Sequence, residues 1–160
     1  MPHPSLNQIE LKPIGLVHSS RKEVKDDLWD EVKTEIHLDQ TRFSKEALAH
    51  LQDFSHIEVI FSMNQVEESA IQMGARHPRN NPDWPKVGIF AQRGKNRPNR
   101  LGLTVCRLNS VEGLVISVTG LDAVEGTPVL DIKPFVKEFA PRGEIRQPVW
   151  MTDLMKNYWE

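Results

Sequence analysis

The side chains best suited to chemistry are basic ones, concentrated in residues 88–108 between two apolar, strand-like runs. Residues 74–110 contain eight Arg or Lys and one acid, Asp83, although the net charge of the chain is −2. Guanidinium groups bind phosphates or carboxylates through two parallel hydrogen bonds. Pro98 fixes the backbone among these side chains, and Gly94 and Gly102 on either side of it allow a ligand to approach closely. The segment therefore predicts a site for an anionic group, with a solvated basic loop as the alternative.

A second cluster is acidic and follows an apolar run at residues 114–121. Asp122, Glu125 and Asp131 surround a Gly126-Thr127-Pro128 turn. Such a turn can aim backbone groups at a ligand, and its carboxylates can favour a cation or bind ribose hydroxyls. The alternative is a hairpin connection with ordinary surface acids. Together, the basic and acidic segments would suit a ligand that carries both charges.

Other kinds of site are excluded or disfavoured. The sequence has no GxGxxG motif, no phosphate-binding loop ending in Lys-Ser or Lys-Thr, and no GxSxG elbow. No metal site is predicted, because the histidines are dispersed without HxxxH spacing. The single cysteine, Cys106, excludes an intramolecular disulfide and is expected to be a buried strand thiol. The six histidines of the chain include His18, His37, His50, His56 and His77.

Length and composition predict one globular domain over residues 1–160, with a core at about 9–136 and a tail at 137–160. Hydrophobic residues make up 39% of the chain and charged residues 26%, which is typical of a soluble protein. No apolar run is long enough to span a bilayer. The first residues lack the pattern of an export signal, so a cytoplasmic location is expected.

Period-two alternation and β-branched residues predict mostly strands. A helix is expected at 45–52, capped by Ser44, with further helices at 66–73 and 151–159. Residues 75–85 read as a loop because they contain three prolines. A hairpin turn is expected at Glu112-Gly113. The fold class is mainly β with short helices, forming a small closed or partly open barrel without a Rossmann domain. The predicted strands are 9–19, 32–38, 57–63, 87–91, 101–108, 114–121 and 130–135.

The two clusters also carry a family resemblance. FAQRGKNRPNRLGLTVCRL and GLDAVEGTPVLDIKP resemble the signature of the TsaA-like (TrmO) family, and IGLVHSS and LQDFSHIEVIF resemble its opening and third strands. The resemblance covers about residues 14–134. It implies a small β-barrel that binds S-adenosylmethionine, forms a homodimer and methylates threonylcarbamoyladenosine at position 37 of tRNA. The chain departs from the family pattern at Leu28-Trp29-Asp30, Asn64 and Arg100-Leu101, and conservatively at Glu125, where the family has Asp.

The resemblance also implies site residues. The chemistry of the side chains, rather than the resemblance, makes Asn64, Asp122 and Glu125 the candidates for catalysis and Trp29 or Trp84 the candidates for stacking on a base. Cofactor contacts are implied at Trp29, Asn64, Gln65, Arg93, Leu103, Glu125, Gly126, Thr127 and Pro128. RNA contacts are implied at Arg97, Asn99 and Arg100.

Methyl transfer from a sulfonium is an in-line displacement, so positioning and exclusion of water would be the main tasks of the site. Two alternatives stay open. One is a non-catalytic module that binds the cofactor or a nucleic acid, and the other is a methyltransferase acting on a small molecule.

Overall fold

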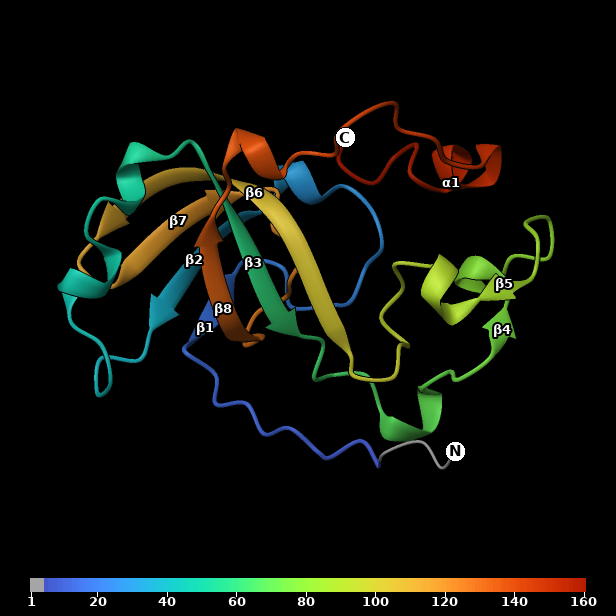
Figure 1. Ribbon diagram of the computed structural model, residues 1–160, viewed down its shortest axis with the longest axis horizontal. Coiled ribbons are helices and arrows are strands. Elements are labelled where there is room, and N and C mark those ends of the chain that lie inside the picture. Colours follow the sequence, from blue (N-terminus) through green and yellow to red (C-terminus); the bar gives the residue numbers. More distant parts are fainter. Residues whose placement is uncertain (1–4) are drawn as a thin grey trace.

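Six strands close into an antiparallel barrel in the computed structural model, which describes residues 5–160 (Figure 1). The expected mainly β barrel is confirmed. A separate two-stranded sheet pairs β4 (Ala75–Arg76) with β5 (Val87–Gly88). The order around the barrel is β1 (Gly15–Ser19), β2 (Lys33–Leu38), β7 (Val115–Thr119), β6 (Leu101–Glu112), β3 (His56–Ser62) and β8 (Pro128–Pro134), which pairs again with β1.

The barrel interior is filled by the alternate side chains of each strand. Ile36, Val59 and Ile116 are fully buried, while their chain neighbours lie on the outer face or are only partly covered. Gly102 of β6 leaves room for the ring of Phe61, since a Cβ at that position would lie 2.3 Å from the ring. The period-two pattern thus specifies which face of each strand is buried.

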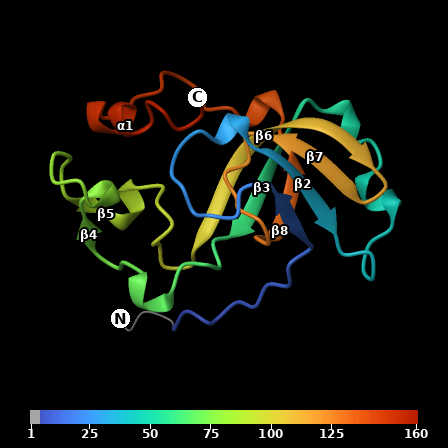
Figure 2. The same ribbon diagram turned by 180° about the vertical axis from the view of Figure 1, so that it is seen from behind.

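The long connection between β3 and β6 leaves the barrel and returns to it, and we call residues 63–100 the excursion. Its two ends lie side by side, because Ser62 pairs with Leu101 and the Met63 N–H donates to the Arg100 carbonyl at 2.8 Å. It contains β4 and β5. Figure 2 shows this small sheet and helix α1 (Val149–Leu154) on the same side of the barrel.

Two of the three expected helices are wrong. Residues 45–52 form two short 3-10 helices, Lys45–Leu48 and Leu51–Asp53, because His50 between them adopts a left-handed backbone with φ 65°. Ser44 makes no side-chain cap. Residues 66–73 contain only the 3-10 helix Glu68–Ala70. The expected tail helix exists but begins and ends earlier, as α1.

Several strand boundaries also differ from the expected ones. The first strand begins at Gly15 rather than residue 9, and Pro13 just before it has no N–H to donate to a ladder. The expected strand 87–91 is limited to β5, after which Ile89–Ala91 forms a 3-10 helix. The expected strand 101–108 continues to Glu112, so the β6–β7 turn is at Gly113-Leu114, one residue later than predicted.

The expectation about export concerned the N-terminus, whose residues 1–4 lie outside the described residues. Among residues 5–160, no helix has the length and apolar character needed to cross a bilayer. The same residues hold no group of three His, Cys, Asp or Glu side chains arranged to bind a metal ion.

Candidate active site

A cavity of about 1140 Å³ lies beside the barrel. It is bounded by β3 and β6 of the barrel, the excursion, the segment before β2, and the C-terminal residues. The excursion and α1 are joined by a hydrogen bond from the Trp84 indole nitrogen to Asp153 Oδ2, at 2.9 Å. The cavity is therefore enclosed by segments that lie far apart in the sequence.

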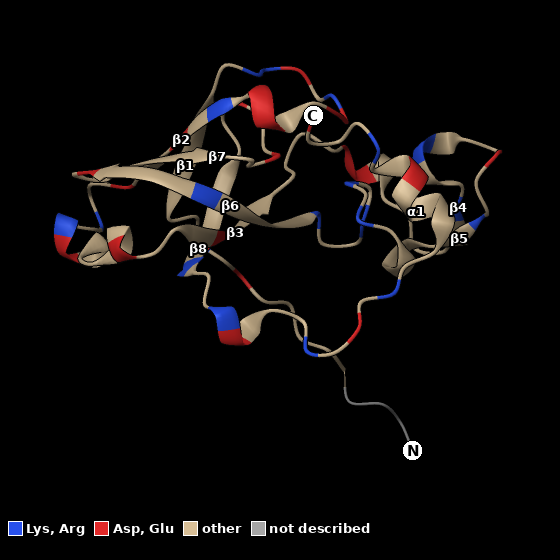
Figure 3. Ribbon diagram, turned by 90° about the horizontal axis from the view of Figure 1, so that it is seen from above, with Lys and Arg blue, Asp and Glu red and all other residues tan. Residues whose placement is uncertain are grey.

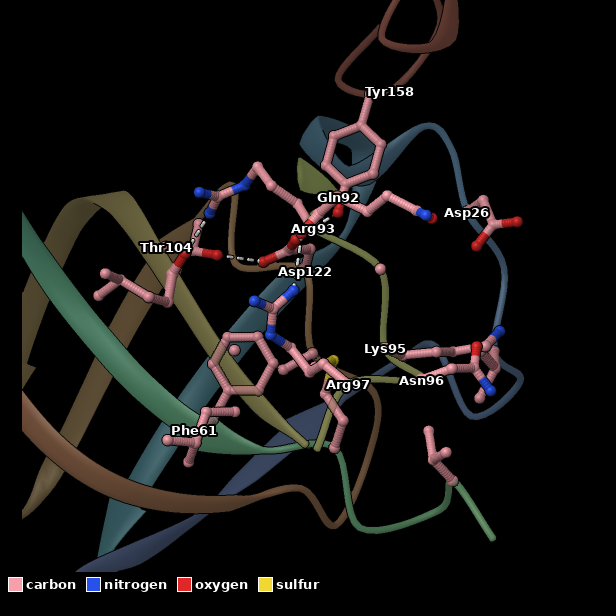
Figure 4. A pocket seen from close by; sticks show the side chains of 18 of the residues that line it. Asp26, Phe61, Gln92, Arg93, Lys95, Asn96, Arg97, Thr104, Asp122 and Tyr158 are labelled. Carbon is pink, nitrogen blue, oxygen red and sulfur yellow. Dashed lines mark hydrogen bonds between the residues drawn. The ribbon is translucent and has the colours of Figure 1, made fainter. Parts of the chain in front are cut away.

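Arg93 is the exposed guanidinium of this cavity. Its Nη2 donates to the Leu103 carbonyl of β6 at 2.7 Å, which fixes the side chain across the opening between the excursion and the barrel. It makes no ion pair with any described residue, so its positive charge is not neutralised within that part of the chain. In Figure 4 it lies beside Asp122 and Tyr158.

Asp122 is the half-buried carboxylate of the cavity. It lies shortly after the end of β7, which is followed by Gly120 and the buried Leu121. The Thr104 hydroxyl donates to one carboxylate oxygen and the Tyr158 hydroxyl to the other (Figure 4). Burial, and then the negative charge of Asp122, raise the pKa of the Tyr158 phenol. Tyr158 therefore stays protonated at neutral pH and acts as a donor.

Carboxylates are scarce on the cavity wall. Among the described residues that line it, only Asp26 and Asp122 carry one. Asp26 is 54% exposed and faces Arg79, with 3.8 Å between Oδ2 and Nε. A cation bound in this cavity would therefore meet Asp122 as the one carboxylate shielded from solvent, where charge interactions are strongest.

The basic loop is organised by hydrogen bonds from its arginines to backbone carbonyls. Arg97 donates to the Gln92 carbonyl at 2.7 Å, and Arg100 donates to the Val66 carbonyl at 2.8 Å. Figure 3 shows several Lys and Arg positions on the side of the molecule that carries β4 and β5. Both arginines thus hold the loop in shape, and Arg97 also adds positive charge to the cavity wall.

The predicted cofactor residues divide into two groups. The acidic turn packs against the end of β1, where the Glu125 carboxylate accepts the Ser19 N–H at 2.6 Å and the Gly126 N–H donates to the Val17 carbonyl at 2.8 Å. Thr127 is buried, and its hydroxyl donates to the Val124 carbonyl. Six of the predicted residues line the cavity: Trp29, Asn64, Gln65, Arg93, Leu103 and Thr127. Glu125, Gly126 and Pro128 are outside its lining.

The predicted catalytic and RNA-binding residues also include some that line the cavity and some that do not. Of the catalytic candidates, Asn64 and Asp122 line the cavity. Of the predicted RNA contacts, Arg97 and Asn99 line it and Arg100 does not.

The two tryptophans named as stacking candidates are used in packing. Trp29 is 4% exposed, and the Arg21 guanidinium lies 4.3 Å from its ring centroid. Trp84 tethers Asp153, as described above, and is outside the cavity lining. Cys106 is buried as expected, and burial raises the pKa of its thiol to about 12.

Sequence reasoning missed the two hydroxyl partners of Asp122. Thr104 was hidden within an apolar strand pattern, although its neighbours on the buried face are Gly102 and Cys106. Tyr158 was assigned only to a helical stripe, and it lies 36 residues from Asp122 along the chain. No local pattern could have indicated that contact.

Comparison with known proteins identifies relatives of this chain in sequence and in fold. The profile of the family described as tRNA-methyltransferase O N-terminal domain matches residues 19–140. The human protein named tRNA (adenine(37)-N6)-methyltransferase is 35% identical over 111 residues, which cover 69% of this chain and 25% of that protein. This chain therefore spans only about a quarter of that relative's length.

A relative from Methanothermobacter thermautotrophicus, named probable S-adenosyl-L-methionine-binding protein, is 31% identical over 140 residues. The match covers 85% of this chain and 96% of that protein. The crystal structure of TrmO from Pseudomonas aeruginosa superposes with a TM-score of 0.73 at 27% identity, covering 91% of this chain and 63% of that one. The chain belongs to the tRNA-methyltransferase O N-terminal domain family.

Proposed function

We propose that this protein is an S-adenosylmethionine-dependent methyltransferase that acts on N6 of adenosine 37 in tRNA, with threonylcarbamoyladenosine as the modified base. The observation that carries the proposal is the cavity, which holds the positive charge of Arg93 and the negative charge of Asp122 at separate places. It is supported by relatives, of which one is named tRNA (adenine(37)-N6)-methyltransferase and another probable S-adenosyl-L-methionine-binding protein.

The residues of the cavity fit the chemical groups of S-adenosylmethionine. Arg93 would bind the carboxylate, and Asp122 would face the cationic sulfur. Leu103 and its neighbours on the outer face of β3 and β6, Ile60 and Val105, offer an apolar slot for adenine. Cavities for single small ligands measure roughly 300–1,000 Å³. The larger volume here leaves room for part of the acceptor base as well.

When bound, S-adenosylmethionine supplies a methyl group that an acceptor nitrogen lone pair attacks, while the C–S bond breaks with its electron pair on sulfur. The residues must then align the two reactants and exclude water. Asp122 would face the positive charge of the bound sulfonium and would accept the proton that the acceptor nitrogen releases. The amide oxygen of Asn64, at the exposed edge of the cavity, can orient the acceptor N–H.

The direct test is incubation of the protein with methyl-labelled S-adenosylmethionine and either total RNA or a small-metabolite extract. We expect label in tRNA, recovered after digestion as an N6-methylated threonylcarbamoyladenosine. Label only in metabolites would indicate another acceptor class. Cofactor binding without label in either pool would indicate a binding module and contradict the proposal.

Arg93 gives a binding test. Arg93→Ala should weaken S-adenosylmethionine binding about tenfold or more, because a charge-assisted hydrogen bond contributes about 1.5–3 kcal/mol. Arg93→Lys, which keeps the charge, is the matched control and should lose less affinity. Unchanged affinity of Arg93→Ala by calorimetry would refute this assignment.

A homodimer is part of the proposal and is supported by apolar side chains on the outside of the barrel. Phe90 is 80% exposed, Leu103 48% and Val105 43%. Covering these side chains with a second copy would remove them from water, and it would place the adenine slot of Leu103 and Val105 at the contact between the two copies. Sedimentation at micromolar concentration should give a dimer for the wild type and a monomer for Val105→Lys. A monomeric wild type would contradict this part.

A further inference from the structure

The C-terminal segment from Pro148 to Glu160, here called the tail, lies outside the residues matched by the family profile. It nevertheless forms one wall of the cavity, through Trp150, Met151, Leu154, Met155, Tyr158 and Trp159. The sequence pattern indicates only an apolar helical stripe there. The geometry of Tyr158 indicates a more specific role.

The end of the tail is held by a series of backbone hydrogen bonds. The N–H groups of Leu28, Trp29 and Asp30 donate to the carbonyls of Asn157, Tyr158 and Trp159, at 3.0, 3.0 and 2.9 Å. Leu28–Asp30 begin the 3-10 helix Trp29–Glu31, whose first N–H groups have no partner inside the helix. The tail therefore caps this helix, and the register of the three bonds fixes the position of Tyr158.

Side-chain packing adds to this anchoring. Tyr158 and Trp159 pack against a small apolar cluster made by Trp29, Val32 and Val124. The two aromatic rings of the tail meet edge to face, with 4.9 Å between their centroids. The Tyr158 ring is thus fixed by packing, and its hydroxyl is left to contact the cavity.

That hydroxyl completes the environment of Asp122. With Thr104 donating to one oxygen and Tyr158 to the other, both oxygens of the carboxylate are held. Arg93 lies close by, yet no ion pair joins it to Asp122 within the described residues. The two hydroxyl bonds fix the orientation of the carboxylate.

We propose that Tyr158 is a positioning residue for methyl transfer, which keeps Asp122 apart from Arg93 and directed at the cationic sulfur of S-adenosylmethionine. This role rests on the proposed function. Through Tyr158, the tail would then help to recognise the positive charge on the sulfur of S-adenosylmethionine. S-adenosylhomocysteine has a neutral sulfur and lacks this charge.

The test compares the affinities of these two ligands in calorimetry. Tyr158→Phe keeps the ring in its packing site and removes only the hydroxyl. We expect the ratio of S-adenosylmethionine to S-adenosylhomocysteine affinity to fall about fivefold, as expected for loss of one hydrogen bond. The matched control is Thr152→Val, which removes a tail hydroxyl that accepts from Gln147 and is outside the cavity lining. It should leave the ratio unchanged.

A double variant separates positioning from a general loosening of the wall. If Tyr158 acts through Asp122, then adding Tyr158→Phe to Asp122→Asn should cause no further change in the ratio. An equal loss of affinity for both ligands in Tyr158→Phe, or no loss, would overturn the role of Tyr158 alone. A wild-type protein that binds neither ligand would overturn the proposed function, and this role with it.

Discussion

Thr34 of β2 has a hydroxyl group that makes no stabilising polar interaction. Its side chain is 1% exposed, and its hydroxyl has no hydrogen-bond partner among residues 5–160. Burying an unpaired hydroxyl costs about 1–3 kcal/mol. Thr34→Val should therefore raise the free energy of unfolding by about 1 kcal/mol, as measured by urea denaturation. A destabilised Thr34→Val would mean that the hydroxyl has a partner in solution.

The buried thiol of Cys106 should make the free energy of unfolding depend on pH in the alkaline range. Burial, and then the negative charge of Asp122, raise the pKa of this thiol from 9.0 to about 12. Above pH 9 the unfolded chain loses this proton first, so the free energy of unfolding falls as pH rises toward 12. The titration of this thiol should lower the free energy of unfolding by about 1 kcal/mol per pH unit in this range.

Denaturant unfolding between pH 8 and pH 10.5 checks this. Cys106→Ala should be less stable at pH 8, because it leaves a small cavity, but its stability should fall less steeply with pH. Equal slopes for the two proteins would contradict the assignment to Cys106.

At the scale of elements, the excursion is tied to the segment before β2 by Arg79, which forms ion pairs with both Asp26 and Asp27. Arg79 donates to both carboxylate oxygens of Asp27, at 2.9 and 3.2 Å. The two side chains are 26% and 35% exposed, which limits the strength of the pair.

A double-mutant cycle of Arg79→Ala and Asp27→Ala should give a coupling energy of about 0.5–1 kcal/mol. The same variants should weaken S-adenosylmethionine binding, because they release one wall of the cavity. Additive effects on stability would show that the pair contributes nothing, and full ligand affinity would show that this wall is held by other contacts.

The barrel strands could be predicted from the sequence because each has a buried and an exposed face. In β2, Thr34, Ile36 and Leu38 alternate with polar residues, and these three are the side chains that the barrel buries. The helix at 45–52 could not be excluded locally, since its apolar spacing suits a helix. Its break at His50 is a left-handed backbone position that the residue type does not require.

The candidate site could be predicted only where its residues are close in sequence. Arg93 and Leu103 were found within one motif, and they are in direct contact. The pairing of Asp122 with Tyr158 depends on how the tail crosses the barrel end, which is set by backbone bonds to residues 28–30. Long-range contacts of this kind produce no periodic pattern in the sequence from which they could be predicted.

At the scale of the molecule, positive charge is collected in one stretch of a chain whose net charge is −2. That stretch lines the cavity, which supports tRNA as the acceptor. Lys95→Ala, which removes a cavity-lining charge with no ion-pair partner among the described residues, should weaken tRNA binding. The slope of log affinity against log salt should become shallower by about 1.

Lys133→Ala is the matched control, since this lysine pairs with Asp131 on β8 and is outside the cavity lining. The measurement is filter binding at several salt concentrations. The slope of log affinity against log salt for Lys133→Ala should equal the wild-type slope. If Lys133→Ala weakens tRNA binding more than Lys95→Ala does, the RNA binds on another face.

The excursion departs from and returns to adjacent, paired positions, Ser62 and Leu101. A connection whose ends already touch can be exchanged for a longer, shorter or chemically different one at little entropic cost to the scaffold. Replacing it with a tight turn should leave a closed barrel that has lost its ligand. New acceptor preferences could therefore arise in this fold by loop replacement alone, while the six strands stay under independent selection for stability.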